Sequence, residues 1–151
     1  MDYRIETKAP LQIIGRTKRM TTVDDAHYHE IGTFWREWDD NGLYRQIGEK
    51  YSSDKTCHVV DVSTPAPKTE EFDYTIGFPY NGAENEDGLN IVTIPGGAYA
   101  VFRVPDASLN DMGGFMHRII TEYLPSLGHQ LLGVDAEYFS DAGAEAWFLI
   151  K

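Results

Sequence analysis

Cysteine and long apolar runs are both scarce in this sequence, which has one cysteine, Cys57. A single cysteine excludes an intramolecular disulfide and a zinc site built from cysteines, and it is typical of a reducing cytoplasm. The N-terminus lacks the basic and then apolar layout of a signal peptide. No run approaches the ~20 apolar residues that a transmembrane helix needs. We therefore expect a cytoplasmic protein without membrane contact.

Basic residues are also few, since 13 Lys and Arg stand against 24 Asp and Glu, for a formal net charge of −11. Nucleic-acid binding relies on Lys and Arg to neutralise phosphates, so this balance argues against direct nucleic-acid binding. The acidity permits cationic ligands, although it also serves solubility.

Recognisable catalytic and metal-binding patterns are missing as well. The sequence has no nucleophile elbow, HExxH or P-loop spacing. His27 and His29 stand without a matching His or Cys cluster, which favours capping or surface roles over metal binding. Cys57 and His58 are adjacent in a predicted strand, so their side chains point to opposite faces and a dyad is disfavoured. We expect no metal and no cofactor.

What the sequence does have is one domain's length, 151 residues, and an aromatic content of 13%. Surplus aromatic side chains often line a pocket or an interface, although an aromatic-rich core is the default interpretation.

The first half of the chain predicts strands around one amphipathic helix. Two extended pieces meet at Ala9-Pro10, and a candidate N-cap follows at residues 21–25. The helix carries an apolar stripe at Ile31, Phe34, Trp35 and Trp38, and Gly42 interrupts or ends it. Strands are expected at 57–62 and, from strict alternation, at 72–80.

The second half repeats this order after an acidic connector at 83–88. A strand at 89–94 turns at Pro95-Gly96-Gly97 and continues to Val104. A helix begins near Ser108, with Ser108 and Asp111 spaced as a capping box, and Pro125 stops it. Strands follow at 133–139 and 145–150. We predict one α+β domain, 1–151, with repeat one at about 1–82 and repeat two at about 89–151, and a ligand cleft at the seam.

Glu137 is the candidate binding residue that the pattern itself singles out. It lies in a mostly apolar strand, where an ionised carboxylate costs several kcal/mol unless a cation or hydrogen bonds compensate it. It is either a buried acceptor for a cationic ligand between aromatic faces or an edge-strand residue that points at water. Glu145, two residues before Trp147, is a weaker candidate of the same kind.

Six segments in order resemble the GyrI-like small-molecule-binding domain, the effector-binding domain of AraC-type and MerR-type multidrug-responsive transcription regulators. They are Tyr3–Thr17 with its Pro10, Phe34-Trp35-Arg36-Glu37, Asp73-Tyr74-Thr75-Ile76-Gly77, Ile94–Phe102, Glu122-Tyr123-Leu124-Pro125 and Glu145–Lys151. The sequence departs from the family at Ala136, where an aromatic residue usually precedes the glutamate, and at Leu149, where proline is usual.

The resemblance implies tandem βαββ repeats with pseudo-twofold symmetry, an antiparallel sheet, two main helices and a central aromatic pocket for lipophilic, often cationic compounds. Glu137 falls on the family's glutamate at the base of the pocket. The aromatic residues implied around it are Trp35, Trp38, Tyr74, Tyr99, Phe115, Phe139 and Trp147.

The chain has no room for a helix-turn-helix, so it resembles the stand-alone members of the family. We expect a binding protein for amphipathic cations that serves transcription regulation or drug sequestration. Two alternatives stay open: a hydrolase of the same fold that uses pocket Glu and Tyr residues, and a module that binds a protein partner such as gyrase.

Overall fold

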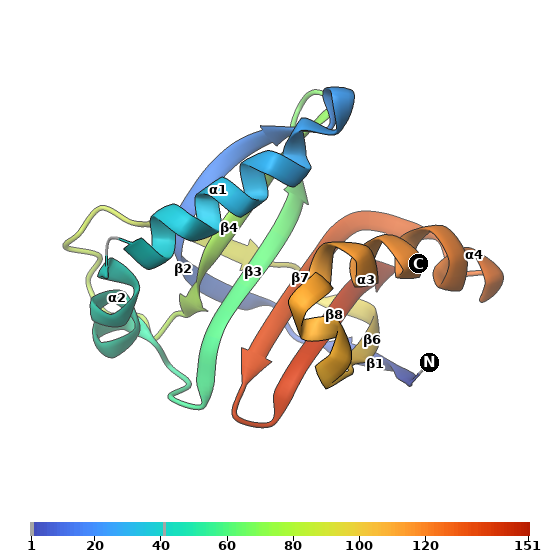
Figure 1. Ribbon diagram of the computed structural model, residues 1–151. Helices are drawn as coiled ribbons and strands as arrows, with labels where there is room; N and C mark the ends of the chain where they lie inside the picture. Colours follow the sequence, from blue (N-terminus) through green and yellow to red (C-terminus); the bar gives the residue numbers. More distant parts are fainter. Residues whose placement is uncertain (1, 41) are drawn as a thin grey trace.

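The computed structural model describes residues 2–40 and 42–151 and shows one large sheet with helices on one side (Figure 1). The strands are β1 (Tyr3–Lys8), β2 (Leu11–Thr21), β3 (Cys57–Pro65), β4 (Glu71–Pro79), β5 (Asn90–Ile94), β6 (Gly97–Val104), β7 (Leu131–Ser140) and β8 (Gly143–Ile150). The helices are α1 (Ala26–Asp40), α2 (Leu43–Tyr51), α3 (Met112–Arg118) and α4 (Leu124–Ser126), with a π-helical turn at Ile119–Tyr123 and 3₁₀ turns at Val23–Asp25 and Asp106–Asp111.

The eight strands form one antiparallel sheet in the order β1-β6-β8-β7-β3-β4-β2-β5. Each half contributes a strand, a helix and two further strands: β2-α1-β3-β4 and then β6-α3-β7-β8. The halves meet where β3 pairs with β7, and the strand order reads outward from this pair in the same way on both sides. The tandem βαββ architecture expected from the sequence is confirmed.

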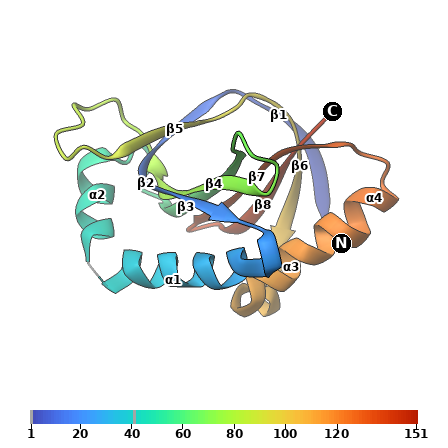
Figure 2. The ribbon, with the colours of Figure 1, turned by 90° about the horizontal axis from the view of Figure 1, so that it is seen from above.

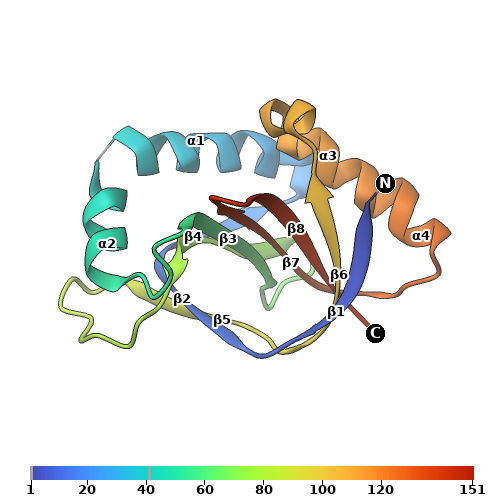
Figure 3. The ribbon, with the colours of Figure 1, turned by 90° about the horizontal axis from the view of Figure 1, so that it is seen from below.

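The outermost strands are exchanged between the halves. β1 pairs with β6 of the second half, and β5 pairs with β2 of the first. The chain therefore crosses from one end of the sheet to the other at Pro10 and at Pro95-Gly96, and the sheet curls round on itself (Figures 2 and 3). A Cβ placed on Gly96 would lie 2.8 Å from Cδ of Pro10, so the two corners touch and glycine is needed there.

Three apolar clusters hold the layers together. One lies between α3 and the outer face of β6 and β8, and it includes Phe102 and Phe115. Another lies between helices α1 and α2 and the outer face of β2 and β4. The third fills the inside of the curled sheet, with Tyr99 and Trp147 among its members. Because alternate residues face opposite sides of a strand, β6 and β8 each contribute side chains to both the α3 cluster and the cluster inside the sheet.

The helices agree with the sequence pattern in one place and depart from it in another. The predicted interruption at Gly42 is confirmed, because this residue has a φ of 63° and separates α1 from α2. The predicted capping box from Ser108 is wrong, since residues 106–111 form a 3₁₀ turn. Asp111 is itself the N-cap of α3, and its side chain accepts a hydrogen bond from the Gly114 backbone N–H.

The sequence predicts that Pro125 stops this helix, but in the structure the helical backbone continues to Ser126. Pro125 lies inside α4, directly after the π-helical turn. The wider turn is closed by the Leu124 N–H, which donates to the carbonyl of Ile119 five residues back. The short helix α4 that follows can then include Pro125, although proline has no backbone N–H to donate.

Candidate functional site

A cavity of about 530 Å³ opens between α1 and α3, over the seam where β3 meets β7. Both helices lie on the same face of the sheet (Figure 3). The residues that line the cavity are Thr22, His27, Tyr28, Ile31, Gly32, Trp35, Ser63, Phe72, Tyr74, Met112, Gly113, Met116, His117, Ile120, Gly133, Asp135 and Glu137. The two halves of the chain therefore each supply one wall and part of the floor.

The walls of the cavity are aromatic on one side and rich in methionine on the other. Trp35 and Tyr28 come from α1, where the stripe at i, i+3 and i+4 turns some rings toward the sheet. Met112 and Met116 lie one turn apart on α3 and line the cavity. Methionine is flexible and polarisable, so these side chains can adapt to ligands of different shape.

The floor of the cavity carries an acidic cluster formed by Asp61, Asp135 and Glu137. In the β3–β7 pairing Asp61 lies directly opposite Glu137, and Ser63 lies directly opposite Asp135. Strand alternation puts Asp135 and Glu137 on one face, as the sequence predicts, while Ala136 packs into the cluster inside the sheet. Asp61 is 1% exposed, whereas Asp135 and Glu137 are half-buried and line the cavity.

A hydrogen bond and a neighbouring hydroxyl group link the aromatic wall to this floor. Trp35 Nε1 donates to the Tyr74 hydroxyl over 2.8 Å. The Tyr74 hydroxyl in turn neighbours the carboxyl group of Asp61 and lowers the pKa of that group, against the larger effect of burial. The second carboxyl oxygen, Oδ2 of Asp61, is buried and has no hydrogen-bond partner in the structure. This arrangement therefore leaves one buried oxygen of the floor unsatisfied.

Burial raises the pKa of every carboxyl group in the acidic cluster. It raises the pKa of Asp135 to about 7 and, together with the nearby charge of Asp135, that of Glu137 to about 8. The pKa of Asp61 is also raised well above its ordinary value, first by burial and then by the charge of Glu137. The cause is that protein surrounds these groups and reduces the solvation of the charged form. Some of these carboxyl groups therefore hold protons near neutral pH.

The acidic cluster lies apart from the ion pairs that the structure describes in residues 2–40 and 42–151. In the described part of the chain, no ion pair joins a Lys, Arg or His side chain to Asp61, Asp135 or Glu137. Residues 2–40 and 42–151 also hold no group of three or more His, Cys, Asp or Glu side chains placed to bind a metal ion.

Of the nine residues proposed from the sequence, Glu137, Trp35 and Tyr74 line this cavity. Trp38 and Phe115 are buried between helix and sheet, 4% and 1% exposed, and lie outside the lining. Phe139 packs beside the α3 cluster, and its ring meets Trp35 edge to face at 6.5 Å. It supports the cavity wall without lining it.

Tyr99, Glu145 and Trp147 lie on the opposite side of the sheet. Tyr99 is fully buried inside the curled sheet and meets Trp147 edge to face. Glu145 and Trp147 are two residues apart on β8, so both side chains lie on the inner face of the sheet. Glu137 pairs with Ala146 and lies on the other face, although β7 and β8 are neighbours. The structure does not bring these three residues to the cavity.

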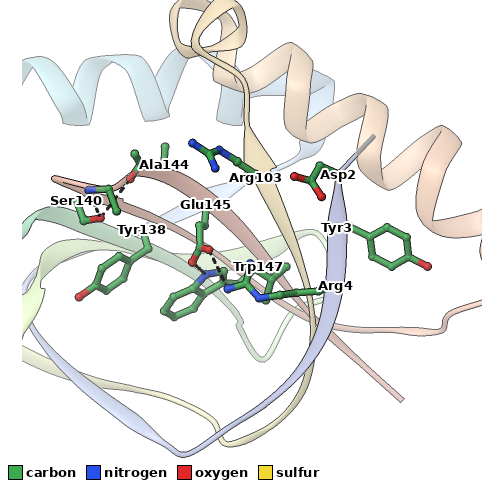
Figure 4. Close-up of a pocket in the computed structure, with 12 residues that line it drawn as sticks. Asp2, Tyr3, Arg4, Arg103, Tyr138, Ser140, Ala144, Glu145 and Trp147 are labelled. Atoms are coloured by element: carbon green, nitrogen blue, oxygen red, sulfur yellow. Dashed lines mark hydrogen bonds and ion pairs between the residues drawn. The ribbon is translucent and has the colours of Figure 1, made fainter.

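A second cavity of about 370 Å³ lies on that side, near β1 and the β7–β8 turn (Figure 4). Figure 4 shows Glu145 directed toward the indole of Trp147 and the guanidinium of Arg4. Glu145 accepts from Trp147 Nε1 over 3.1 Å and from Arg4 Nη2 over 2.9 Å. Tyr138 stacks on the Trp147 ring and Lys8 lies over it at 3.8 Å. These groups already satisfy one another, so we place the candidate site in the larger cavity.

Sequence reasoning missed several residues of the larger cavity. Asp61 stands between Val60 and Val62, and an acidic residue inside an apolar strand is the same signal that pointed to Glu137. Met112 and Met116 are one helical turn apart in the sequence, and no sequence signal separates a core methionine from one that lines a pocket.

The fold and the cavity together define an effector-binding domain of the GyrI-like type. The model of the family described as integron-associated effector binding protein matches residues 4–149, so the chain belongs to this family. A comparison with curated protein sequences gave no match.

Solved structures share this fold at low sequence identity. SAV2435 bound to tetraphenylphosphonium is 18% identical over 100% of this chain and 94% of that chain, with a TM-score of 0.75. A putative bacterial transcription regulation protein from Staphylococcus aureus is 20% identical, with 100% and 99% covered and a TM-score of 0.72. An integron cassette protein from the Vibrio cholerae mobile metagenome is 13% identical, with 99% and 95% covered and a TM-score of 0.61.

The described residues contain no helix that is long and apolar enough to span a membrane.

Proposed function

We propose that this protein binds lipophilic organic cations in the cavity between α1 and α3, with Glu137 as the counter-charge. The observation that carries the proposal is the acidic cluster at the floor of an apolar cavity, which forms no ion pair with Lys, Arg or His in the described part of the chain. The ligand bound to SAV2435, tetraphenylphosphonium, belongs to the same chemical class.

The energetics favour a cation over a neutral ligand of the same shape. A carboxylate surrounded by protein costs several kcal/mol when it is uncompensated, and a cation at the floor offsets this cost. Trp35, Tyr74 and Phe72 add the attraction of aromatic faces for a positive charge. Burial of one or two ligand rings contributes a few kcal/mol, which corresponds to affinities on the order of micromolar.

As part of the same proposal, the protein recognises several ligands of this class and serves transcription regulation or drug sequestration. The flexible methionine wall supports the breadth of ligands, because Met112 and Met116 can repack around different shapes.

The test compares methyltriphenylphosphonium with methyltriphenylsilane, a neutral compound of nearly the same shape. Binding is followed through tryptophan fluorescence, since Trp35 lines the cavity, at about pH 8, where Glu137 is substantially ionised. Glu137→Gln is expected to weaken phosphonium binding by about 10- to 100-fold, or about 1.4 to 2.8 kcal/mol, and silane binding by less than about threefold.

Glu122→Gln is the matched control, because Glu122 is exposed on the π-helical turn and lies outside the cavity. It should leave both affinities unchanged. Equal losses for the phosphonium and the silane in Glu137→Gln would contradict charge neutralisation. A wild-type protein that binds neither compound would contradict the proposed function itself.

A further inference from the structure

We propose that Asp61 is a positioning residue beneath Glu137, which keeps its own proton and stabilises the Glu137 carboxylate that forms when a cation binds. One proton is then released to solvent for each cation bound. This inference rests on the proposed function and adds to it a proton linkage and a role for a residue outside the cavity lining.

The first support is the geometry of the two carboxyl groups. Asp61 and Glu137 are directly opposite on paired antiparallel strands, so their side chains share one face at close range. Asp61 is 1% exposed, while Glu137 is half-buried and reaches the cavity. A cation can therefore contact Glu137, and the deeper Asp61 acts only through Glu137.

The second support is the unsatisfied oxygen of Asp61. A buried carboxyl oxygen without a partner costs free energy, and Oδ2 of Asp61 is such an atom. The Tyr74 hydroxyl is the neighbouring polar side chain that favours the charged form of this carboxyl group, and its effect is smaller than that of burial. A proton on Oδ2 turns the unsatisfied acceptor into a donor, and the carboxylate of Glu137 across the strand pair is the acceptor on the same face.

The third support is the charge balance of the empty cavity. Two neighbouring carboxyl groups cannot both ionise cheaply when no cation is near. The titratable groups that face Glu137 are Asp61 on β3, Tyr74 on β4, Asp135 on β7, His27 and Tyr28 on α1, and His117 on α3. No Lys or Arg is among these groups, and burial raises the pKa of all three carboxyl groups.

The binding step follows from this balance. The neutral Glu137 carboxylic acid and an organic cation become a carboxylate–cation pair, and the proton goes to the buffer. Asp61 stays protonated and donates to the new carboxylate. The affinity for a cation should then rise about tenfold for each pH unit while Glu137 is protonated in the empty protein, and it should level off above about pH 8. The affinity for a neutral ligand should not follow this course.

The experiment measures methyltriphenylphosphonium binding by calorimetry from about pH 6 to about pH 9, in buffers of different ionisation enthalpy that report protons released. Three proteins are compared: wild type, Asp61→Asn and Asp61→Val. Asparagine keeps an N–H donor at this position, whereas valine has a similar volume but no donor and suits a strand flanked by Val60 and Val62.

The wild type should release about one proton per cation near pH 7, and Asp61→Asn should keep its pH profile with affinity within about threefold. Asp61→Val should bind about tenfold more weakly near pH 7 and recover at higher pH, because the Glu137 carboxylate has lost its donor. Unchanged methyltriphenylsilane affinity in Asp61→Val shows that its cavity is intact.

His27 and His117 also line the cavity, so the double variant His27→Gln/His117→Gln is measured alongside. A pH profile that disappears in this double variant overturns the proposal. So does a wild type that binds the cation without releasing a proton, or an Asp61→Val profile that coincides with the wild type. Failure of the wild type to bind the cation at any pH contradicts the proposed function instead, so the two failures are distinguishable.

Discussion

Replacement of Glu137 by glutamine should raise the free energy of unfolding of the ligand-free protein in mild alkali and leave that free energy unchanged in mild acid. The folded protein holds the proton of Glu137 up to about pH 8, because burial raises the pKa from its ordinary value of 4.5. Between these values the unfolded chain is ionised and the folded chain is not, so the free energy of unfolding falls as the pH rises. Below about 4.5 both states are protonated and the penalty vanishes.

The magnitude follows from the width of this window. Each pH unit costs about 1.4 kcal/mol for one proton, and solvent that reaches Glu137 through the cavity reduces the effect. We therefore expect Glu137→Gln to gain about 2 to 4 kcal/mol over the wild type at pH 8. Two other carboxyl groups, those of half-buried Asp54 and exposed Asp87, act in the opposite sense in acid. Hydrogen bonds from Thr56 and Tyr51 lower the pKa of Asp54 and of Asp87 respectively, so their stabilisation is lost as the pH falls through those lowered values.

The assay is urea unfolding of the wild type, Glu137→Gln and the Glu122→Gln control at about pH 5, 6.5 and 8. The wild type and the Glu122→Gln control should lose stability together across this range, while Glu137→Gln should lose less; some loss remains because the pKa values of Asp61 and Asp135 are also raised. A wild type that is as stable at pH 8 as at pH 5, or a Glu137→Gln protein with no gain at pH 8, would refute the argument that burial keeps Glu137 protonated.

Two further predictions concern the frame of the cavity. Gly15→Ala should cost at least about 3 kcal/mol in urea unfolding, because its Cβ would lie 1.9 Å from the Ile76 carbonyl oxygen and force β2 from β4. Gly113→Ala, whose Cβ meets nothing within 4 Å, is the control and should change little. Trp35→Phe removes the donor to Tyr74 and should weaken methyltriphenylphosphonium binding by about 3- to 10-fold in calorimetry. Trp38→Phe is the control, because Trp38 lies in the core and not in the cavity lining. It should lower the free energy of unfolding but leave methyltriphenylphosphonium binding unchanged.

The sequence was sufficient for much of the fold because its patterns are local. Alternation at 72–80 and the glycine break at Gly42 both depend on neighbouring residues, and both predictions agree with the structure. The predicted helix start near Ser108 is wrong because a 3₁₀ turn and an α-helix share the same preferences for small polar residues at their starts. Only the hydrogen bond from Gly114 shows that Asp111 is the cap.

The site was harder to predict because it depends on which strands become neighbours. The apolar strand around Glu137 indicates an unusual carboxyl group, but it does not say that β3 and Asp61 will lie across from it. The family resemblance implies Trp147 and Tyr99 as pocket residues. Strand parity and the curl of the sheet turn them inward instead, and no local pattern encodes that curl.

The exchanged outer strands have a consequence for the order in which the protein folds. β1 must wait for β6, and β3 must wait for β7, so the decisive pairings join segments that are far apart in the chain. Folds dominated by such pairings form slowly, because the chain loses the entropy of closing a long loop before the stabilising contacts form. Neither half can build the cavity floor first. The ability to bind a ligand and the completion of the whole sheet are therefore one cooperative event.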